Sequence, residues 1–135
     1  MTRVDFYLAN GDKHLAACKL VHKAFRLGHR IYLRTQDASE TERLDELLWT
    51  FAAGSFIPHR RNADDARVPV VIGHEAPPEA LNDVMVSLAH DVAPYYERFQ
   101  RVAEIVGAED TDKQRARERF RFYRERGCSP ETHTL

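Results

Sequence analysis

The sequence has few of the residues that build disulfide-bonded or zinc-dependent folds. Its 135 residues include only two cysteines, Cys18 and Cys128, which lie far apart and match no zinc-binding spacing. It also has no apolar run of the length that a membrane helix requires. The first residues alternate like a strand and do not resemble a signal peptide. We therefore expect a cytoplasmic protein that needs no disulfide, no metal and no membrane.

Glycine-rich loops that hold phosphate are missing as well. The turn after the first predicted strand, residues 8–14, contains one glycine and matches neither of the common phosphate-binding patterns. Asp12 would also place a negative charge where a phosphate should lie. No nucleophile with a matching base stands out elsewhere, although His59, beside two arginines, is a candidate base. We expect no catalytic residues and no cofactor, which argues against a small nucleotide-dependent enzyme.

Three potential metal ligands follow one another at helical spacing near the beginning of the chain. They are His14, Cys18 and His22, at positions i, i+4 and i+8. Three residues that climb one helix edge cannot all reach a single ion, and no further ligand cluster follows in the sequence. A partly exposed helix flank explains this spacing better than a metal site does.

The order of apolar patterns indicates one α/β domain, residues 1–135. A hydrophobic content of 43% and a charged content of 30% are ordinary for a globular protein of this length. Segments with strand character alternate with segments of helical periodicity. The predicted strands are residues 3–8, 29–34, 70–72, 84–88 and 102–106, and the predicted helices are residues 13–27, about 37–49 and about 110–126. Residues 54–67 are expected to be irregular. This order favours a three-layer α/β fold with a mainly parallel sheet of about five or more strands and helices on both faces.

Positive charge is concentrated in the last predicted helix. Residues 1–112 contain 13 Lys and Arg against 18 Asp and Glu, whereas residues 113–135 contain 7 against 3. At 100° per residue, one side of this helix collects an aromatic ring and four cations: Lys113, Arg117, Phe120, Arg121 and Arg124. Such a face suits an acidic ligand. Two alternatives stay open, namely a solvated helix whose arginines keep it soluble, and direct nucleic-acid binding with Phe120 as a stacking surface.

Large apolar side chains gather in a second region, residues 47–58. Trp49, Phe51, Phe56 and Ile57 lie around the end of a predicted helix and the loop that follows it. Tryptophan and phenylalanine are typical of interface anchors, but they also fill ordinary cores under loops. The sequence pattern alone leaves both readings open.

Together these two regions resemble the chi subunit family of bacterial DNA polymerase III. Residues 43–49, with the sequence R-L-D-E-L-L-W, and residues 55–59, with S-F-I-P-H, resemble that family's R-L-D-x-x-L-W…S-F-[IV]-P-H pattern. Residues 116–127 are similar to its A-R-x-R-[YF]…Y-R…G ending, and residues 4–8 are similar to its first strand. Two specific blocks in the right order make the resemblance stronger than a single short motif would.

The resemblance implies a Rossmann-like fold without catalytic activity, acting as a bridge in the bacterial replisome and so associated with the nucleoid. In that family one surface binds the acidic C-terminal tail of single-stranded-DNA-binding protein. Another surface binds the psi subunit, which connects chi to the clamp loader. DNA would be contacted only indirectly. Where psi is absent, the second surface would dock on another clamp-loader or replication protein, or pack internally.

The resemblance also assigns positions in this chain to the two surfaces. The positions for the acidic tail are Lys113, Arg117, Phe120, Arg121, Arg124, Val106 and Thr132. The positions for psi are Trp49, Phe56, Ile57 and Pro58. Phe120 stands where a tyrosine can occur in the family, so a hydrogen bond from that hydroxyl is lost here. Thr132 lies in a tail that departs from the family pattern, next to the acidic Glu131.

Overall fold

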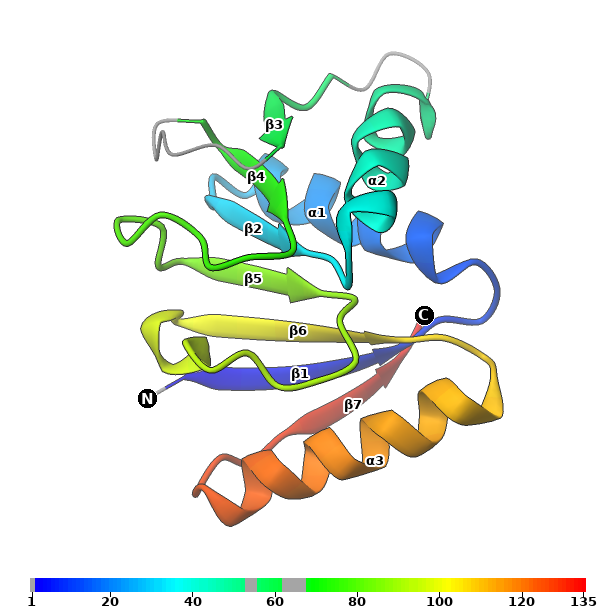
Figure 1. Cartoon of the computed structure of the whole chain (residues 1–135), viewed down its shortest axis with the longest axis vertical. Coiled ribbons are helices and arrows are strands. Elements are labelled where there is room, and N and C mark those ends of the chain that lie inside the picture. The colour runs from blue at the N-terminus through cyan, green and yellow to red at the C-terminus, as the bar shows by residue number, and fades with distance from the viewer. Residues whose placement is uncertain (1, 53–55, 62–67) are drawn as a thin grey trace.

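A parallel β-sheet forms the centre of the molecule in a computed structural model that describes residues 2–52, 56–61 and 68–135. Its seven strands lie in the order β3-β4-β2-β5-β6-β1-β7, and every neighbouring pair is parallel (Figure 1). The strands are β1 Arg3–Leu8, β2 Ile31–Arg34, β3 His59–Arg61, β4 Val70–Gly73, β5 Val84–Ser87, β6 Arg101–Val106 and β7 Glu131–Thr134. The helices are α1 Lys13–Arg26, α2 Ala38–Thr50 and α3 Asp110–Glu125, with a 3-10 turn, η1, at Tyr96–Arg98. The predicted α/β fold with a mainly parallel sheet is confirmed.

Local signals in the sequence explain where the helices begin and end. Asp12 caps α1 by accepting a hydrogen bond from the His14 amide at 2.9 Å, and Asp37 caps α2 in the same way. Gly28 follows α1 with a φ of +88°, a left-handed conformation that glycine adopts without steric cost. Gly127 has the same role after α3.

Two hydrophobic cores lie on opposite faces of the sheet. On one face α1 and α2 pack against the sheet through apolar residues such as Val21 and Leu44. On the other face α3 and the η1 segment pack against residues such as Phe6 and Val102. Buried side chains of β1 and β6 therefore alternate between the two cores, as the period of a strand requires. The three-layer arrangement with helices on both faces agrees with the expectation from sequence.

The helices do not cover the sheet evenly. On its own face α1 packs mainly on β2, β5 and β6, and α2 packs on β3 and β4. On the face of the sheet that α1 and α2 cover, β1 and β7 have no helix as their main packing partner among the described residues. On the opposite face α3 lies alongside the β7 end of the sheet (Figure 1).

Two strands were not predicted. β3 lies within residues 54–67, which were expected to be irregular, and β7 lies within the expected C-terminal tail. Both are edge strands with mostly polar, exposed side chains, so they lack the apolar run that marks a buried strand. The described helices include none that is long and apolar enough to cross a bilayer.

Candidate protein-binding surfaces

A buried polar network fixes α3 to the sheet. Glu104 of β6 is fully buried and faces α3, where Arg119 and Tyr123 are also buried. Arg119 Nε donates to Glu104 Oε1 at 3.1 Å, and the Tyr123 hydroxyl donates to Glu104 Oε2 at 2.6 Å. Arg119 also donates to the His90 carbonyl at 2.9 Å. A helix held by directional bonds along its C-terminal half presents its outer side chains in a defined orientation.

The environment of Glu104 shifts its protonation equilibrium. Burial raises the pKa of this carboxyl, while the Arg119 charge and the Tyr123 hydrogen bond act in the opposite direction. Burial and the neighbouring carboxylate also raise the pKa of Tyr123, so its hydroxyl stays a donor. Sequence reasoning missed this network. Its signals were an acid in the middle of the apolar strand 102–106 and an arginine in phase with Ala116 and Tyr123 on the buried side of the helix.

The side of α3 that was predicted to be basic is exposed. Lys113, Arg117, Arg121 and Arg124 all lie at the surface, and none forms an ion pair with any residue that the structure describes. Phe120 lies at the inner border of this row, half-buried, with its ring centroid 5.3 Å from that of Phe6. We call these five residues the basic face of α3. Cations without acidic partners can pair with an anionic ligand, and the ring that they border can contact an apolar group of the same ligand.

β7 extends the sheet beside the basic face. Thr132 lies opposite Phe6 in the parallel register of β1 and β7, so both residues point to the side of the sheet that α3 covers. Phe120 contacts the same Phe6, which places Thr132 next to the basic face. Glu131 lies opposite Asp5 and therefore points to the other side of the sheet. The acid next to Thr132 in sequence is thus turned away from the basic face.

Val106 does not share this exposure. It is the last residue of β6 and is only 1% exposed, within the core under α3. Without a ligand the core already encloses this side chain, and its expected role as a pocket residue stays a prediction. Val106 belongs to the packed layer beneath the site.

The second predicted surface lies at the end of α2. Trp49 is 49% exposed and Phe56 is 65% exposed, and their ring centroids are 5.3 Å apart. We call this pair the Trp49 patch. Pro58 is half-buried nearby in sequence, but Ile57 is fully buried in the core with Leu48. Ile57 therefore points inward while its neighbour Phe56 points outward, and the expected contact of Ile57 with a partner stays a prediction.

The buried His59 ring packs against Trp49 on the inner side of the Trp49 patch. Its ring lies 4.3 Å from the Trp49 ring, centroid to centroid, and its side chain is completely buried. Its two ring nitrogens lie 2.6 Å from the Ile57 carbonyl and 3.1 Å from the Asp45 carbonyl. A histidine with both nitrogens engaged in this way is a structural support for the loop. It is not placed as a catalytic base.

The edge of the sheet where nucleotides bind in many α/β proteins is closed here. Lys13 and Asp112, at the beginnings of α1 and α3, form an ion pair with 3.0 Å between Nζ and Oδ2. A Cβ at Gly107 would lie 2.5 Å from that same carboxylate oxygen, so the loop packs directly against it. Asp12 caps α1 with its own carboxylate. Carboxylates thus lie at both helix N-termini, which removes the usual place for a phosphate.

A comparison with known protein families decides the relationship. The family model described as DNA polymerase III chi subunit, HolC, matches residues 1–131. The chain belongs to the DNA polymerase III chi subunit family. It is 40% identical to the DNA polymerase III subunit chi of Pseudomonas aeruginosa over 139 aligned residues, covering 100% of this chain and 98% of the relative. The corresponding subunit of Escherichia coli is 31% identical over 99% of both chains, and that of Haemophilus influenzae is 22% identical over 88% of this chain and 85% of the relative.

The histidines and cysteine that follow one another on α1 of this chi family member have separate structural partners. His14 contacts Glu40 at 2.9 Å, and the His22 ring lies against Phe51. Cys18 is fully buried, where desolvation raises the pKa of its thiol to about 12. A partly exposed flank was expected, and the burial of Cys18 corrects that in part.

One group of three potential metal ligands occurs among the described residues. Asp5, Glu131 and His133 place their ligand atoms within 4.8 Å of one another. Asp5 also bonds Arg3 at 3.2 Å and Arg101 at 3.1 Å. Two guanidinium groups on the central carboxylate already neutralise it and would repel a cation. The group is better explained as an ion-pair cluster on the uncovered side of β1.

Proposed function

We propose that this chain is a noncatalytic adaptor of DNA polymerase III. In this proposal the basic face of α3 and the neighbouring Thr132 bind the acidic C-terminal tail of single-stranded-DNA-binding protein. The Trp49 patch binds the psi subunit or another clamp-loader component. Family membership supports a role as a polymerase accessory subunit. The assignment of the two surfaces rests on their chemistry and on the family resemblance of their residues.

The observation that carries the proposal is the row of cations around Phe120. A tail that ends in aspartates and a phenylalanine needs cations for its acids, a donor for its terminal carboxylate and an apolar surface for its ring. From Lys113 to Arg124 the row is about 16 Å long at the rise of an α-helix. About five residues of an extended peptide cover that distance. The basic face therefore matches a short acidic tail in length as well as in charge.

The positions of the two surfaces support a bridging role. β7 and β3 are the two edge strands of the sheet, with the basic face beside β7 and the Trp49 patch beside β3. Figure 1 shows α3 and α2 at opposite ends of the molecule. Partners on two such separate surfaces would not exclude each other.

Direct binding of nucleic acid is the alternative use of the same arginines. Base stacking would require the face of Phe120, but this ring already packs against Phe6 and is only partly exposed. The chain as a whole also has a formal net charge of −1, which would repel a long polyanion outside the basic face. Both features favour a short acidic peptide.

A titration with a synthetic acidic tail peptide, with and without its final phenylalanine, tests the proposal by fluorescence anisotropy. We expect Arg117→Ala and Arg121→Ala each to cost about 1–3 kcal/mol, or roughly 5- to 150-fold in Kd. Arg126→Ala is the matched control. It removes the same charge from the end of the same helix, but Arg126 lies on the other flank, 4.4 Å over the Phe122 ring. We expect it to change the Kd less than twofold, and higher salt to weaken binding moderately.

The outcomes separate the two functions. Unchanged affinity in both arginine variants would refute the assignment of the basic face. If removal of the final phenylalanine has no effect and a single-stranded oligonucleotide binds as tightly as the peptide, then direct nucleic-acid binding is the better account. Loss of peptide binding on deletion of that phenylalanine, with weak oligonucleotide binding, supports capture of the tail.

A further inference from the structure

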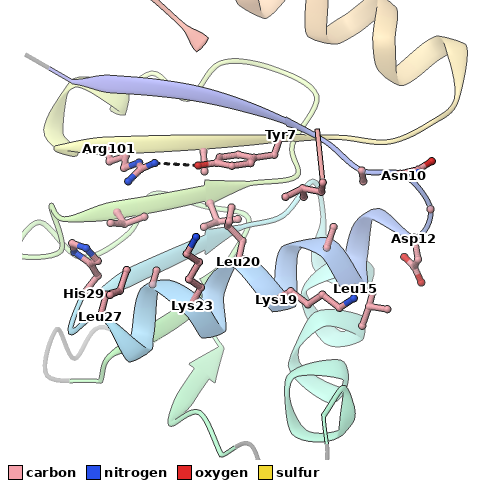
Figure 2. Close-up of a pocket in the computed structure, with 18 residues that line it drawn as sticks. Tyr7, Asn10, Asp12, Leu15, Lys19, Leu20, Lys23, Leu27, His29 and Arg101 are labelled. Atoms are coloured by element: carbon pink, nitrogen blue, oxygen red, sulfur yellow. Dashed lines mark hydrogen bonds between the residues drawn. The ribbon is translucent and has the colours of Figure 1, made fainter. Parts of the chain in front are cut away.

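A separate groove lies on the other side of the sheet from α3. It runs between α1 and the uncovered part of the sheet and has a volume of about 620 Å³ (Figure 2). Its wall is formed by α1 residues such as Leu15, Ala16 and Leu20, and its floor by Tyr7 of β1 and Ala103 of β6. We call it the α1 groove. It exists because β1 lies beyond the part of the sheet that α1 covers.

The ends of the α1 groove are unusually apolar for a protein surface. Leu27, just after α1, is 69% exposed, and Leu135, hydrogen-bonded to the end of β1, is 48% exposed. Both line the groove. Among the described residues only two other large apolar side chains are this exposed, and they are Trp49 and Phe56. Large exposed apolar side chains grouped around a concave surface mark an interaction site.

The rim of the α1 groove is positively charged. Lys19 and Lys23 line it from α1, are exposed, and form no ion pair with a described residue. Figure 2 shows both side chains extending from α1. They are four residues apart, which is about 6 Å along the helix. The acid that lines the groove, Asp12, is engaged as the cap of α1. The groove therefore combines apolar surface with cations that lack partners, and it complements a ligand that is apolar and acidic.

The backbone of the groove determines which kind of segment fits. The strands in its floor, β1, β5 and β6, are each paired on both sides within the sheet. An extended peptide lying there would find no free backbone groups, and its own would lose water without a partner. A helix satisfies its backbone internally. It would also continue the layer that α1 and α2 begin on this face of the sheet.

We propose that the α1 groove binds an amphipathic, acidic α-helix of a partner protein. The apolar stripe of this helix lies on Tyr7 and Leu20, and acids four residues apart on its flank pair with Lys19 and Lys23. A second copy of this chain fits poorly, because a two-fold contact through α1 would bring the same lysines against each other. This interaction is additional to the proposed function and uses neither the basic face nor the Trp49 patch.

A stapled helical peptide of about 15 residues, as long as α1, serves as the probe. It carries leucines at i, i+3, i+4 and i+7 and glutamates four residues apart beside this stripe. We expect anisotropy titrations at low salt to show binding that a scrambled peptide of the same composition lacks. Amide NMR shifts should appear in α1 and β1. The double variant Lys19→Glu, Lys23→Glu should bind about tenfold more weakly. A second peptide with lysines in place of those glutamates should recover the affinity.

Matched controls keep the test specific. Arg26→Glu reverses an exposed cation in the last turn of α1 that does not line the groove, and it should change the Kd less than twofold. Leu27→Ser should weaken binding, and because Leu27 is 69% exposed we expect the variant to fold like the wild type. Circular dichroism checks that each variant is folded.

Three results would overturn the proposal: equal binding of the scrambled peptide, amide shifts confined to α3 or the Trp49 patch, or no recovery with the charge-reversed peptide. The acidic tail peptide is titrated against the same variants. Unchanged tail binding in Lys19→Glu, Lys23→Glu separates failure of this proposal from failure of the basic-face assignment.

Discussion

Removal of one hydroxyl tests whether the buried network holds α3 in place. Tyr123→Phe keeps the ring that packs against Phe6 and Tyr96 and so leaves no cavity. It removes the donor that lies 2.6 Å from Glu104 Oε2. A hydrogen bond to a buried charged group contributes about 1.5–3 kcal/mol, and an acceptor left without a partner in the core keeps its desolvation cost. We therefore expect a loss of about 2 kcal/mol in the free energy of unfolding.

The size of this loss should depend on pH. Burial already holds the pKa of Glu104 above its usual value. Loss of a donor to the charged carboxylate raises the folded-state pKa further. Tyr123→Phe loses stability only when the Glu104 carboxyl is ionised. The loss in its free energy of unfolding should therefore grow as the pH rises through the pKa of Glu104 in the folded protein. It should shrink as the pH falls toward the pKa of this carboxyl in the unfolded chain. We expect a larger difference from the wild type at pH 8 than at pH 5.

Urea unfolding followed by far-ultraviolet circular dichroism measures this effect. Fluorescence is a poor probe here, because the single tryptophan, Trp49, is half-exposed on a surface patch. With a urea dependence of about 2 kcal/mol per M, a loss of about 2 kcal/mol lowers the midpoint by about 1 M. Tyr95→Phe is the control, since the hydrogen bond that the Tyr95 hydroxyl donates to the Glu75 carbonyl is long, 3.4 Å, and exposed to solvent.

The proposed role of the Tyr123 hydroxyl is refuted if Tyr123→Phe loses no more stability than Tyr95→Phe at both pH values. That result would mean that the buried carboxyl does not rely on the tyrosine donor. α3 would then be held by apolar packing alone.

Two further predictions concern the Trp49 patch and the β1 ion-pair cluster. Phe56 is 65% exposed, so Phe56→Ala should change the free energy of unfolding by less than about 1 kcal/mol. We expect the same variant to bind purified psi more than tenfold more weakly in calorimetry. Equal binding of psi by the variant and the wild type would show that the Trp49 patch is not part of the interface. Burial alone would raise the pKa of Asp5, but the His133 hydrogen bond and the charges of Arg101 and Arg3 outweigh it and lower that pKa below 3.8. This stabilisation is present at neutral pH and is lost as pH falls through the lowered pKa. Asp5→Asn should therefore be less stable at pH 7, with a gap to the wild type in urea unfolding that narrows below about pH 4; a gap that does not vary with pH would contradict it.

The sequence patterns predicted the parts of the fold whose signals are local. The strands β1, β2, β4, β5 and β6 follow apolar runs, and the cap residues and C-terminal glycines mark the helix ends. β3 and β7 have no such signal, because their polar side chains lie at the sheet edges and only pairing with β4 and β1 makes them strands. Local patterns cannot show which segment finds an unpaired edge.

The candidate surfaces divide in the same way. Helical spacing alone placed the four cations and Phe120 on one side, and all four cations are exposed. Exposure within an irregular segment cannot be derived from spacing, and Ile57, which follows the exposed Phe56 in sequence, is fully buried. The Glu104 network and the α1 groove depend on contacts between distant segments. No periodicity in a single segment reveals them.

The position of β1 in the sheet has a consequence for how the chain acquires its structure. β1 is paired only with β6 and β7, the last two strands in sequence order. Contacts between segments so far apart close late and slow the folding of a parallel sheet. During synthesis β1 therefore stays unpaired, and its apolar side chains stay exposed to water until nearly all the rest of the chain has emerged from the ribosome. We therefore expect the β1 segment to be where a nascent chain depends most on a chaperone.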